Sequence, residues 1–543
     1  MEILCAKDLT FTYAGEKAPV LHSCSFCVES GEFVLLYGAS GSGKTTLLRL
    51  LKPEIAPKGT REGTLHFCEK PIAELPYAQS VKEIAFTAQN PDTQQVSEYV
   101  RNELRFLPEN LGLSEAEIRL KVAETVSFFG AQDLYNRKIQ TLSGGEKQLV
   151  NLMAAFVCSP RLLLLDEPFS MLDPFSGERF LGALLKLHTD LGVTVLLTEH
   201  NIQPILPFLT KVLVLEQGVC KSYDSADDFL RVYPTAAPSV SIPAAAGVPI
   251  ADAVPKTLGQ CRNLVQAYNV SPHLPEQTEI SRGTPLLTLR RAAFRYARGG
   301  EDVLRDVDFT LCRGDCFAVI GANGAGKTTF LKLLSGELSP YSGKAKYAEE
   351  LRVAVVPQNP QTCFAFDTVG EILNTSAIPP TAKTLFKRFN GTPNPAPQNA
   401  RVQEIAEALG LLEFLPRNPF DLSAGQQQRV AIAAALLKEP DVLLFDEPTK
   451  GLDPACKQSL CALLRDLREA GKTVLFVTHD LDFAAEIATR CALLFDGEFV
   501  LQAASRAFFT SGTVYTSSTA QVFCDTEPAR RPVSLSEVQN GEA

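Results

Sequence analysis

The sequence predicts an α/β fold that occurs twice in one chain. Apolar runs at residues 162–165 and 193–197 are typical of parallel strands that are buried on both faces. A glycine-rich loop ending in Gly-Lys-Thr occurs twice, as GASGSGKT at residues 38–45 and as GANGAGKT at residues 321–328. Such a loop joins a strand to a helix and binds phosphate groups with its backbone N–H groups. We therefore expect two nucleotide-binding α/β domains in tandem.

The predicted elements of the first half follow in the order that this fold requires. Strand-like segments at residues 2–4, 9–13 and 33–37 precede the first glycine-rich loop, which leads into a predicted helix at residues 45–51. A longer helical stretch is predicted at residues 114–130. It lies between segments of the α/β core, so we expect a helical subdomain inserted between residues 89 and 143.

Several motifs recur at matching distances from the two loops. Tyr13 lies 31 residues before Lys44, and Tyr296 lies 31 residues before Lys327. The motifs that follow are AQNPDTQ at 88–94 and PQNPQTC at 357–363, LSGGEKQ at 142–148 and LSAGQQQ at 422–428, LLLLDEP at 162–168 and VLLFDEP at 442–448, and TVLLTEH at 194–200 and TVLFVTH at 473–479. Chance does not produce this order twice. The chain is an internal duplication with a period of about 280 residues, the size of a whole domain.

The complete motif set resembles the ATP-binding cassette (ABC) ATPases, in both halves of the chain. The resemblance implies two P-loop NTPase domains of the ABC type, each with an inserted helical subdomain. It implies ATP and Mg²⁺ as cofactors and ATP hydrolysis as the reaction. Both Asp-Glu pairs are present, so we expect both sites to hydrolyse ATP.

The resemblance also implies a role for each matching residue. Nucleotide contacts are implied for Tyr13, Gly38, Ser40, Gly41, Gly43, Lys44, Thr45, Thr46, Ser143, Gly144, Gly145, Tyr296, Gly321, Asn323, Gly324, Gly326, Lys327, Thr328, Thr329, Ser423, Ala424 and Gly425. Mg²⁺ contacts are implied for Thr45, Gln89, Asp166, Thr328, Gln358 and Asp446. Catalytic roles are implied for Gln89, Glu167, His200, Gln358, Glu447 and His479. A glutamate in this position is suited to polarise the attacking water.

The signature segments are implied to serve the opposite cassette. Ser143, Gly144 and Gly145 would then cap the nucleotide that Lys327 binds, and residues 423–425 would cap the one that Lys44 binds, which gives two ATP per chain. The second signature has Ala424 where LSGGQ has glycine. A methyl group is tolerated there at negative φ, and a weaker composite site is the alternative.

Composition excludes several classes of protein. The formal net charge is −10 and no basic tail occurs, which argues against binding built on nucleic-acid phosphates. No run of 18 apolar residues occurs, and the N-terminus alternates like a strand, so we expect neither a membrane span nor a signal peptide. Cys24 and Cys27 have CxxC spacing without a second ligand pair. We expect the 14 cysteines to be free core residues in a reducing compartment.

We expect four regions along the chain. Residues 1–232 would form the first cassette, 233–285 a linker rich in Pro and Ala, 286–520 the second cassette and 521–543 a frayed tail. Within the second cassette, the Pro/Asn-rich residues 378–399 would form an exposed loop.

Three functions remain open at this point. QNPDTQ at 89–94, ENLGL from Glu109 and FFTSGTVYTSS at 508–518 resemble the ATPases of energy-coupling factor (ECF) importers. A tandem sugar-importer ATPase is the second possibility, although such chains commonly carry a degraded second site, whereas Glu447 and His479 are intact. A soluble ribosome-acting ATPase is the third, but its linker is a charged helix, unlike residues 233–285.

The ECF resemblance implies partners and a location. Separate integral membrane subunits, one for coupling and one for substrate binding, would form the transport path for a vitamin, a vitamin precursor or a metal ion. The chain would then be a peripheral protein on the cytoplasmic face of the cell membrane. We expect the segments around Gln89 and Gln358 to dock on the membrane subunits, with Asp92 receiving a basic residue.

Overall fold

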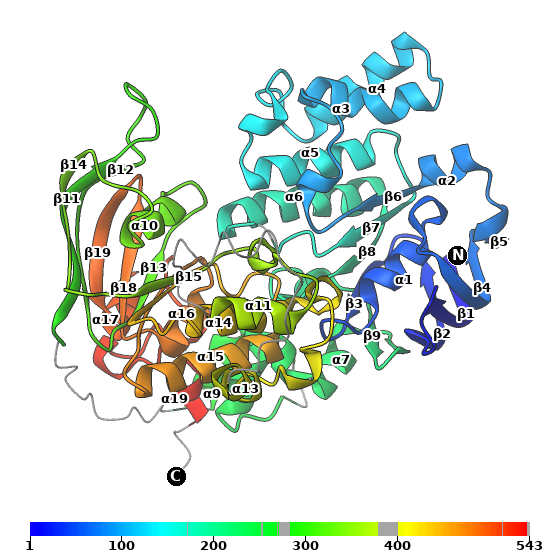
Figure 1. Cartoon of the computed structure of the whole chain (residues 1–543). Helices are drawn as coiled ribbons and strands as arrows, with labels where there is room; N and C mark the ends of the chain where they lie inside the picture. Colours follow the sequence, from blue (N-terminus) through cyan, green and yellow to red (C-terminus); the bar gives the residue numbers. More distant parts are fainter. Residues whose placement is uncertain are drawn as a thin grey trace. The chain divides into compact units, whose positions relative to one another are not determined.

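The phosphate loops belong to two separate units of the chain, Met1–Val270 and Ser271–Ala543 (Figure 1). The computed structural model describes residues 1–170, 172–250, 254–268, 270, 283–377, 400–512 and 514–539. Each unit contains a six-stranded sheet, a smaller antiparallel sheet and a group of helices. No helix of these described residues is long and apolar enough to cross a membrane.

The six-stranded sheet of the first unit carries the phosphate loop at the end of a central strand. Its strand order is β10-β9-β3-β8-β7-β6, and only β9 and β10 pair antiparallel. Every residue of β7 and β8 is buried, as expected for strands covered on both faces. The strands are β3 (Phe33–Tyr37), β6 (Ile84–Thr87), β7 (Leu162–Asp166), β8 (Thr194–Thr198), β9 (Lys211–Glu216) and β10 (Val219–Tyr223).

The antiparallel sheet of the first unit has the order β2-β1-β4-β5. Two short strands were expected at residues 2–4 and 9–13, but β1 runs continuously from Glu2 to Tyr13. Asp8 adopts a positive φ of 49°, and the pairing register shifts around it, so a bulge replaces the expected break. The other strands are β2 (Leu21–Glu29), β4 (Gly59–Phe67) and β5 (Lys70–Pro71).

A helical subdomain is inserted after β6, as predicted. It consists of α3 (Val100–Asn110), α4 (Glu115–Phe128) and α5 (Gly144–Phe156), which pack around their own apolar cluster. Ser114 and Glu117 form a capping box at the start of α4. In Figure 1, α3 and α4 lie beyond α5, away from β1. Other helices of this unit are α1 (Lys44–Leu50), α2 (Tyr77–Glu83), α6 (Pro174–Leu191) and α7 (Ala226–Val232).

The second unit repeats the strand order of the first, β19-β18-β13-β17-β16-β15, which supports the inferred duplication. Its antiparallel sheet has the order β12-β11-β14. The strands are β11 (Pro285–Phe294), β12 (Leu304–Cys312), β13 (Cys316–Ile320), β14 (Ser342–Tyr347), β15 (Val353–Val356), β16 (Val442–Asp446), β17 (Thr473–Thr478), β18 (Arg490–Phe495) and β19 (Glu498–Ala504).

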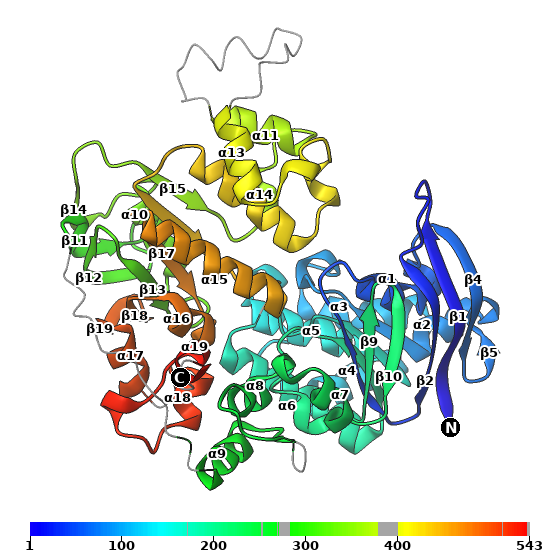
Figure 2. The same ribbon diagram turned by 90° about the horizontal axis from the view of Figure 1, so that it is seen from below.

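Figure 2 shows α11, α13 and α14 of the second unit grouped together, as the inserted subdomain. The helices described in this unit are α10 (Lys327–Leu334), α11 (Val369–Ser376), α13 (Ala400–Ala408), α14 (Ala424–Leu436), α15 (Pro454–Glu469), α16 (Leu481–Ile487), α17 (Ser505–Ser511), α18 (Ser518–Val522) and α19 (Leu535–Gln539). The loop expected at residues 378–399 lies outside the described residues.

The expectation that residues 233–285 form a linker without secondary structure is wrong for much of this segment. It contains α8 (Pro238–Ala245) and α9 (Leu258–Ala267). Pro238 is at the first position of α8, where a missing N–H costs nothing. Val240 is completely buried in the core of the first unit, and Cys261 is also completely buried. Of the prolines that suggested a linker, Pro238 instead marks the start of α8, and Pro243 lies inside that helix.

The tail expected at residues 521–543 is also ordered over its described part. Val533 is buried in the core of the second unit. The Ser517 hydroxyl donates to the Val533 carbonyl at 2.5 Å, and Arg506 pairs with Glu537 at 2.6 Å. The predicted fraying is therefore wrong up to the end of α19.

The cysteine prediction needs one correction. Cys5 on β1 and Cys27 on β2 are directly opposite in the strand register and are joined by a disulfide. Cys24 is buried and free, and its Sγ donates to the Gly218 carbonyl at 3.0 Å, so it does not act with Cys27 as a ligand pair. The CxxC motif is therefore incidental, whereas a cross-strand pair was missed because sequence spacing does not show register.

Candidate active sites

The first phosphate loop connects β3 to α1 and needs glycine at defined positions. Gly41 and Gly43 adopt φ of 80° and 102°, in the left-handed region that favours glycine. A Cβ on Gly38 would lie 2.5 Å from the Leu215 carbonyl oxygen. Lys44 opens α1 and is buried, and its ammonium group donates to the Gly38 and Ala39 carbonyls at 2.8 and 3.0 Å. The loop therefore holds a buried positive charge at a helix N-terminus.

The second loop repeats this geometry between β13 and α10. Gly324 and Gly326 have φ of 85° and 99°. A Cβ on Gly321 would lie 2.5 Å from the Leu494 carbonyl oxygen. Lys327 donates to the carbonyls of Gly321 and the next residue at 2.8 and 3.1 Å. Ser40 and Asn323 occupy equivalent positions inside the two loops.

The predicted Mg²⁺ ligands meet in pairs in each unit. Thr45 donates its hydroxyl to Asp166 at 3.2 Å, and Thr328 donates to Asp446 at 2.9 Å. Burial raises the pKa of both aspartates, while these threonine hydrogen bonds act in the opposite direction. Hydroxyl and carboxylate oxygens are the ligands that Mg²⁺ prefers, so the donor set fits this ion.

The predicted catalytic glutamates share an unusual backbone conformation. Glu167 and Glu447 directly follow β7 and β16 and have φ of 45° and 47°. A positive φ is strained for a residue with a long side chain and is typical of functional sites. The same strain at both equivalent positions argues that the direction of the glutamate side chain matters.

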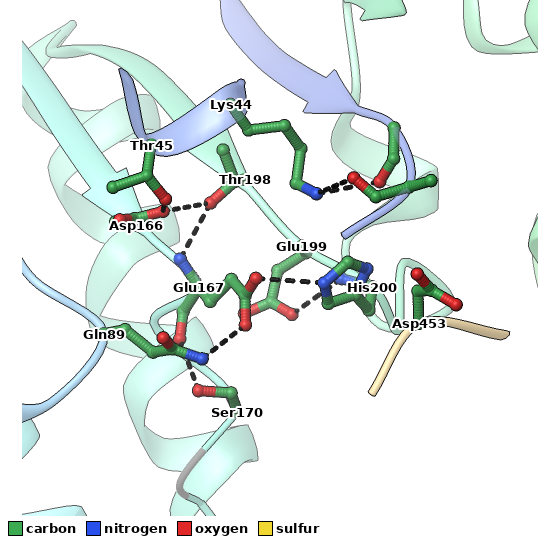
Figure 3. A network of polar contacts seen from close by, with 12 residues as sticks. Lys44, Thr45, Gln89, Asp166, Glu167, Ser170, Thr198, Glu199, His200 and Asp453 are labelled. Carbon is green, nitrogen blue, oxygen red and sulfur yellow. Dashed lines mark hydrogen bonds and ion pairs between the residues drawn. The ribbon is translucent and has the colours of Figure 1, made fainter. Parts of the chain in front are cut away.

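In the first unit, Glu167 contacts both other predicted catalytic residues (Figure 3). Gln89 donates its side-chain amide to Glu167 Oε2 at 2.7 Å, and His200 Nε2 lies 2.9 Å from Glu167 Oε1. Thr198 links the two acidic residues of the site. Its hydroxyl donates to Asp166 at 2.9 Å and accepts from the Glu167 N–H at 2.9 Å. The site is therefore a connected polar network.

In the second unit, Glu447 keeps the histidine contact but has the phosphate-loop lysine as a partner where Glu167 has Gln89. Its carboxylate lies 3.3 Å from Lys327 Nζ and 2.8 Å from His479 Nδ1, and it accepts from the His479 backbone N–H at 3.2 Å. Burial alone would raise the pKa of Glu447, but His479 and Lys327 outweigh it and hold this pKa below its usual range. Gln358 is exposed, and no contact among the described residues joins it to Glu447.

The two tyrosines lie beside the first turn of the loop helices. The hydroxyls of Tyr13 and Thr46 share a hydrogen bond of 2.7 Å, and those of Tyr296 and Thr329 share one of 3.0 Å. Tyr296 is 64% exposed, so its ring face is accessible. An adenine ring could stack on such a face, which stays a prediction.

Each signature serine is the N-cap of a helix, as predicted. Ser143 forms a capping box with Glu146 at the start of α5, and Ser423 forms one with Gln426 at the start of α14. Ala424 is the first residue of α14, so its backbone is helical with negative φ and the glycine of LSGGQ is not required there. The pairing of each signature with the opposite cassette stays a prediction.

At the next signature position, Gly145 and Gly425 are required by close packing, whereas Ala424 shows that glycine is not required at the position before it. A Cβ on Gly145 would lie 2.5 Å from the Ser176 side chain at the start of α6, and one on Gly425 would lie 2.8 Å from Cys456 Sγ on α15. Gly144 precedes Gly145 in the first turn of α5. These glycines allow each signature helix to approach its neighbour closely.

A family model described as ABC transporter matches residues 21–170 and 304–450 of this chain. The chain belongs to the ABC transporter family. It is a tandem ABC ATPase with one P-loop domain in each unit, and ATP hydrolysis is the reaction characteristic of such domains.

Relatives extend along nearly the whole tandem chain. A Bacillus cereus protein, provisionally named an ABC transporter ATP-binding protein, is 34% identical over 537 residues, covering 94% of this chain and 93% of the relative. A Bacillus subtilis protein, provisionally named HMP/thiamine import ATP-binding protein YkoD, is 29% identical over 535 residues, covering 94% and 93%. The structure of the archaeal ribosome recycling factor aABCE1 superposes with a TM-score of 0.58 at 23% identity, covering 93% of this chain and 91% of that one, which shows the fold alone.

Sequence reasoning missed two polar residues of this ABC ATPase. Thr198 contacts both Asp166 and the Glu167 N–H, and the buried Glu199 accepts hydrogen bonds beside the same site. A signal was present in the sequence, because TVLLTEH carries Thr-Glu before its histidine where TVLFVTH carries Val-Thr. The duplication itself therefore marked these positions as different.

Proposed function

We propose that this chain is the ATP-hydrolysing subunit of an ECF-type importer whose membrane subunits are separate proteins. In this proposal it binds the cytoplasmic face of the membrane and energises uptake of a vitamin, a vitamin precursor or a metal ion. The observation that carries the proposal is the full-length similarity to the relative named for HMP/thiamine import. The ECF-like segment at residues 89–94 adds to it.

The residues of each site would divide the reaction between them. Lys44 and Lys327 would bind the terminal phosphates together with the loop N–H groups. Thr45 and Asp166, with their counterparts Thr328 and Asp446, would hold Mg²⁺, which neutralises charge on the transferred phosphoryl group when it is bound. Glu167, held by Gln89 and His200, would orient the attacking water and polarise it.

The segment proposed to dock on membrane subunits is firmly folded. Asn90 caps the short turn Pro91–Thr93, and Gln94 bonds two backbone groups at β6 at 2.7 and 3.2 Å. Asp92 already has a partner in its own chain, because Lys147 donates to it at 2.7 Å. The Asp92 side chain is nevertheless 62% exposed, so an external basic residue can still reach it.

The decisive experiment is recovery of membrane subunits with the tagged chain from detergent extracts. We expect wild-type chain to recover integral membrane proteins, and Asp92→Arg to recover less without a change in ATP affinity. Lys147→Met is the matched control, because it removes only the internal pair. Equal loss in both variants would assign the effect to the Asp92–Lys147 pair and not to docking.

The two alternatives have distinct outcomes in the same experiment. Sedimentation of the chain with ribosomes, and no membrane subunit, would favour the ribosome-acting class. A sugar-importer ATPase would recover membrane subunits of a sugar transporter. The intact pairs of Glu447 with His479 and Lys327 give the second site the residues that a degraded site would lack.

A further inference from the structure

Glu199 is a buried carboxyl group that the roles proposed above do not use. It directly follows β8, is 3% exposed, and precedes His200. Its Oε1 accepts the Phe169 backbone N–H at 2.7 Å, and its Oε2 accepts the His200 backbone N–H at 3.2 Å. A single side chain thus joins two loops of the first site, as Figure 3 shows for His200.

The first of these loops leads to α6, against which the signature helix α5 of the same unit packs. Phe169 begins the segment that ends at Asp173, the N-cap of α6. Asp173 accepts from the Ser176 N–H at 3.0 Å, and Ser176 is the residue against which Gly145 of α5 packs. Glu199 therefore connects the histidine loop to the segment on which the signature helix rests.

In the second unit, no carboxyl group stands at the position of Glu199, and another group accepts the histidine backbone N–H. Its equivalent residue is Thr478, whose hydroxyl accepts the Asp480 N–H at 3.0 Å. The His479 backbone N–H is accepted by Glu447 itself, at 3.2 Å. One Glu447 carboxylate thus serves the histidine backbone, the histidine ring and Lys327.

The comparison isolates what Glu199 does. In the first unit the histidine backbone is held by Glu199, so Glu167 keeps its two oxygens for Gln89 and for the His200 ring. In the second unit the catalytic glutamate carries both tasks. The orientation of a catalytic base strongly affects the reaction rate, because a small displacement of the base weakens its alignment with the attacking water.

We propose that Glu199 is a positioning residue of the first ATP site. By holding the His200 and Phe169 backbones, it leaves the Glu167 carboxylate to the Gln89 and His200 side chains, which orient it toward the attacking water. It makes the two sites hydrolyse ATP at different rates. This inference rests on the proposed catalytic roles of Glu167 and Glu447, and it holds whether the chain serves an importer or another machine.

The test separates the two sites with glutamate variants of the full chain. Glu447→Gln leaves the first site active, and Glu167→Gln leaves the second. In the Glu447→Gln background we expect Glu199→Thr to lower kcat by about ten- to a hundredfold, with KM for ATP nearly unchanged. In the Glu167→Gln background the same substitution is expected to leave turnover unchanged.

Conservative and reciprocal variants distinguish positioning from a folding effect. Glu199→Gln keeps one accepting oxygen and is expected to retain more activity than Glu199→Thr. Thr478→Glu, in the Glu167→Gln background, is expected to raise turnover of the second site. Glu124→Thr, on the exposed face of α4, is the surface control.

Each outcome of these measurements either supports or overturns the positioning role of Glu199. Equal effects of Glu199→Thr in both backgrounds, or a change confined to KM, would overturn the proposal. If Glu199→Thr does not fold, unchanged turnover in both Glu199→Gln and Thr478→Glu would also overturn it. Failure of the catalytic assignment would be visible separately, as unchanged ATPase activity in the two glutamate backgrounds before Glu199 is altered.

Discussion

Gln89 donates a 2.7 Å hydrogen bond to the carboxylate of Glu167. The corresponding Glu447 of the second unit instead contacts Lys327, its phosphate-loop lysine, at 3.3 Å. The two sites therefore carry the same residue types in different arrangements.

The first prediction concerns the base in each site. Glu167→Gln together with Glu447→Gln should lower ATP turnover by about two to four orders of magnitude, the usual effect of removing a positioned base. The amide keeps the size of the side chain and the loop lysines, so ATP binding should persist. Steady-state hydrolysis measures the loss of turnover, and binding of labelled ATP measures the retained affinity. Turnover near the wild-type level would disprove the assignment.

The second prediction concerns the glutamines. Gln89→Ala, in the Glu447→Gln background, should lower kcat by about tenfold, because Glu167 loses a partner that fixes its orientation. Gln358→Ala, in the Glu167→Gln background, should have a smaller effect, since Gln358 is exposed and makes no contact with Glu447 among the described residues. Parallel kinetics of the two variants provide the check, and equal losses would contradict it.

The sequence predicted those parts of the fold that depend on local patterns. The apolar runs gave β7 and β8, and the helical stretch predicted at residues 114–130 gave α4. The prediction of a linker at residues 233–285 failed because proline has two interpretations. It can mark an irregular segment, or it can begin a helix, as Pro238 does. Motifs brought Gln89, Glu167 and His200 to one site, but the contact between Lys327 and Glu447 depends on distances that spacing does not contain.

The third prediction concerns the segment that was expected to be a linker. Val240 on α8 is completely buried, so Val240→Asp should destabilise the first unit by several kcal/mol, about the cost of burying an unpaired charge. Val232→Asp is the matched control, because Val232 is 57% exposed. Chemical unfolding of both variants checks this. Equal stability would show that α8 contributes nothing to the core.

The fourth prediction concerns the pH dependence of stability. Burial, with the nearby charges of Glu167 and Asp166, raises the pKa of Glu199 from 4.5 to about 8. The folded chain therefore keeps a proton on Glu199 that the unfolded chain releases. Burial of neutral Glu199 therefore contributes to the stability of the folded chain. This contribution is fully present below pH 4.5 and is lost as the pH rises to about 8.

Glu199→Gln should remove that loss, because the amide does not titrate. The stability of wild type relative to this variant should fall between these pH values by at most about 1.4 kcal/mol per pH unit. Unfolding of both proteins at pH 5 to 9 measures the difference. A difference that does not change with pH would contradict the raised pKa. His200 also faces Glu199, through its backbone N–H, and it is present in both proteins.

The fifth prediction concerns the contact between Gly145 of α5 and Ser176 of α6. A methyl group on Gly145 would meet the Ser176 side chain at 2.5 Å, too close for two non-bonded atoms. Gly145 has no positive φ, so Gly145→Ala changes packing without forcing the backbone. We expect this substitution to separate the two helices, and to lower both thermal stability and ATP turnover. The cost should be about 1 to 3 kcal/mol, typical of overpacking.

A second substitution provides the control within the same contact. Ser176→Gly removes the atoms that the new methyl group would meet, so the double variant Gly145→Ala with Ser176→Gly should be more stable than the sum of the single effects predicts. Ser176→Gly alone should cost about 1 kcal/mol through its helix propensity. Additive losses in the four-member cycle would show that Gly145 is required for another reason, such as close approach of the signature backbone to a nucleotide. Recovery of stability together with ATP turnover would assign the glycine to helix packing.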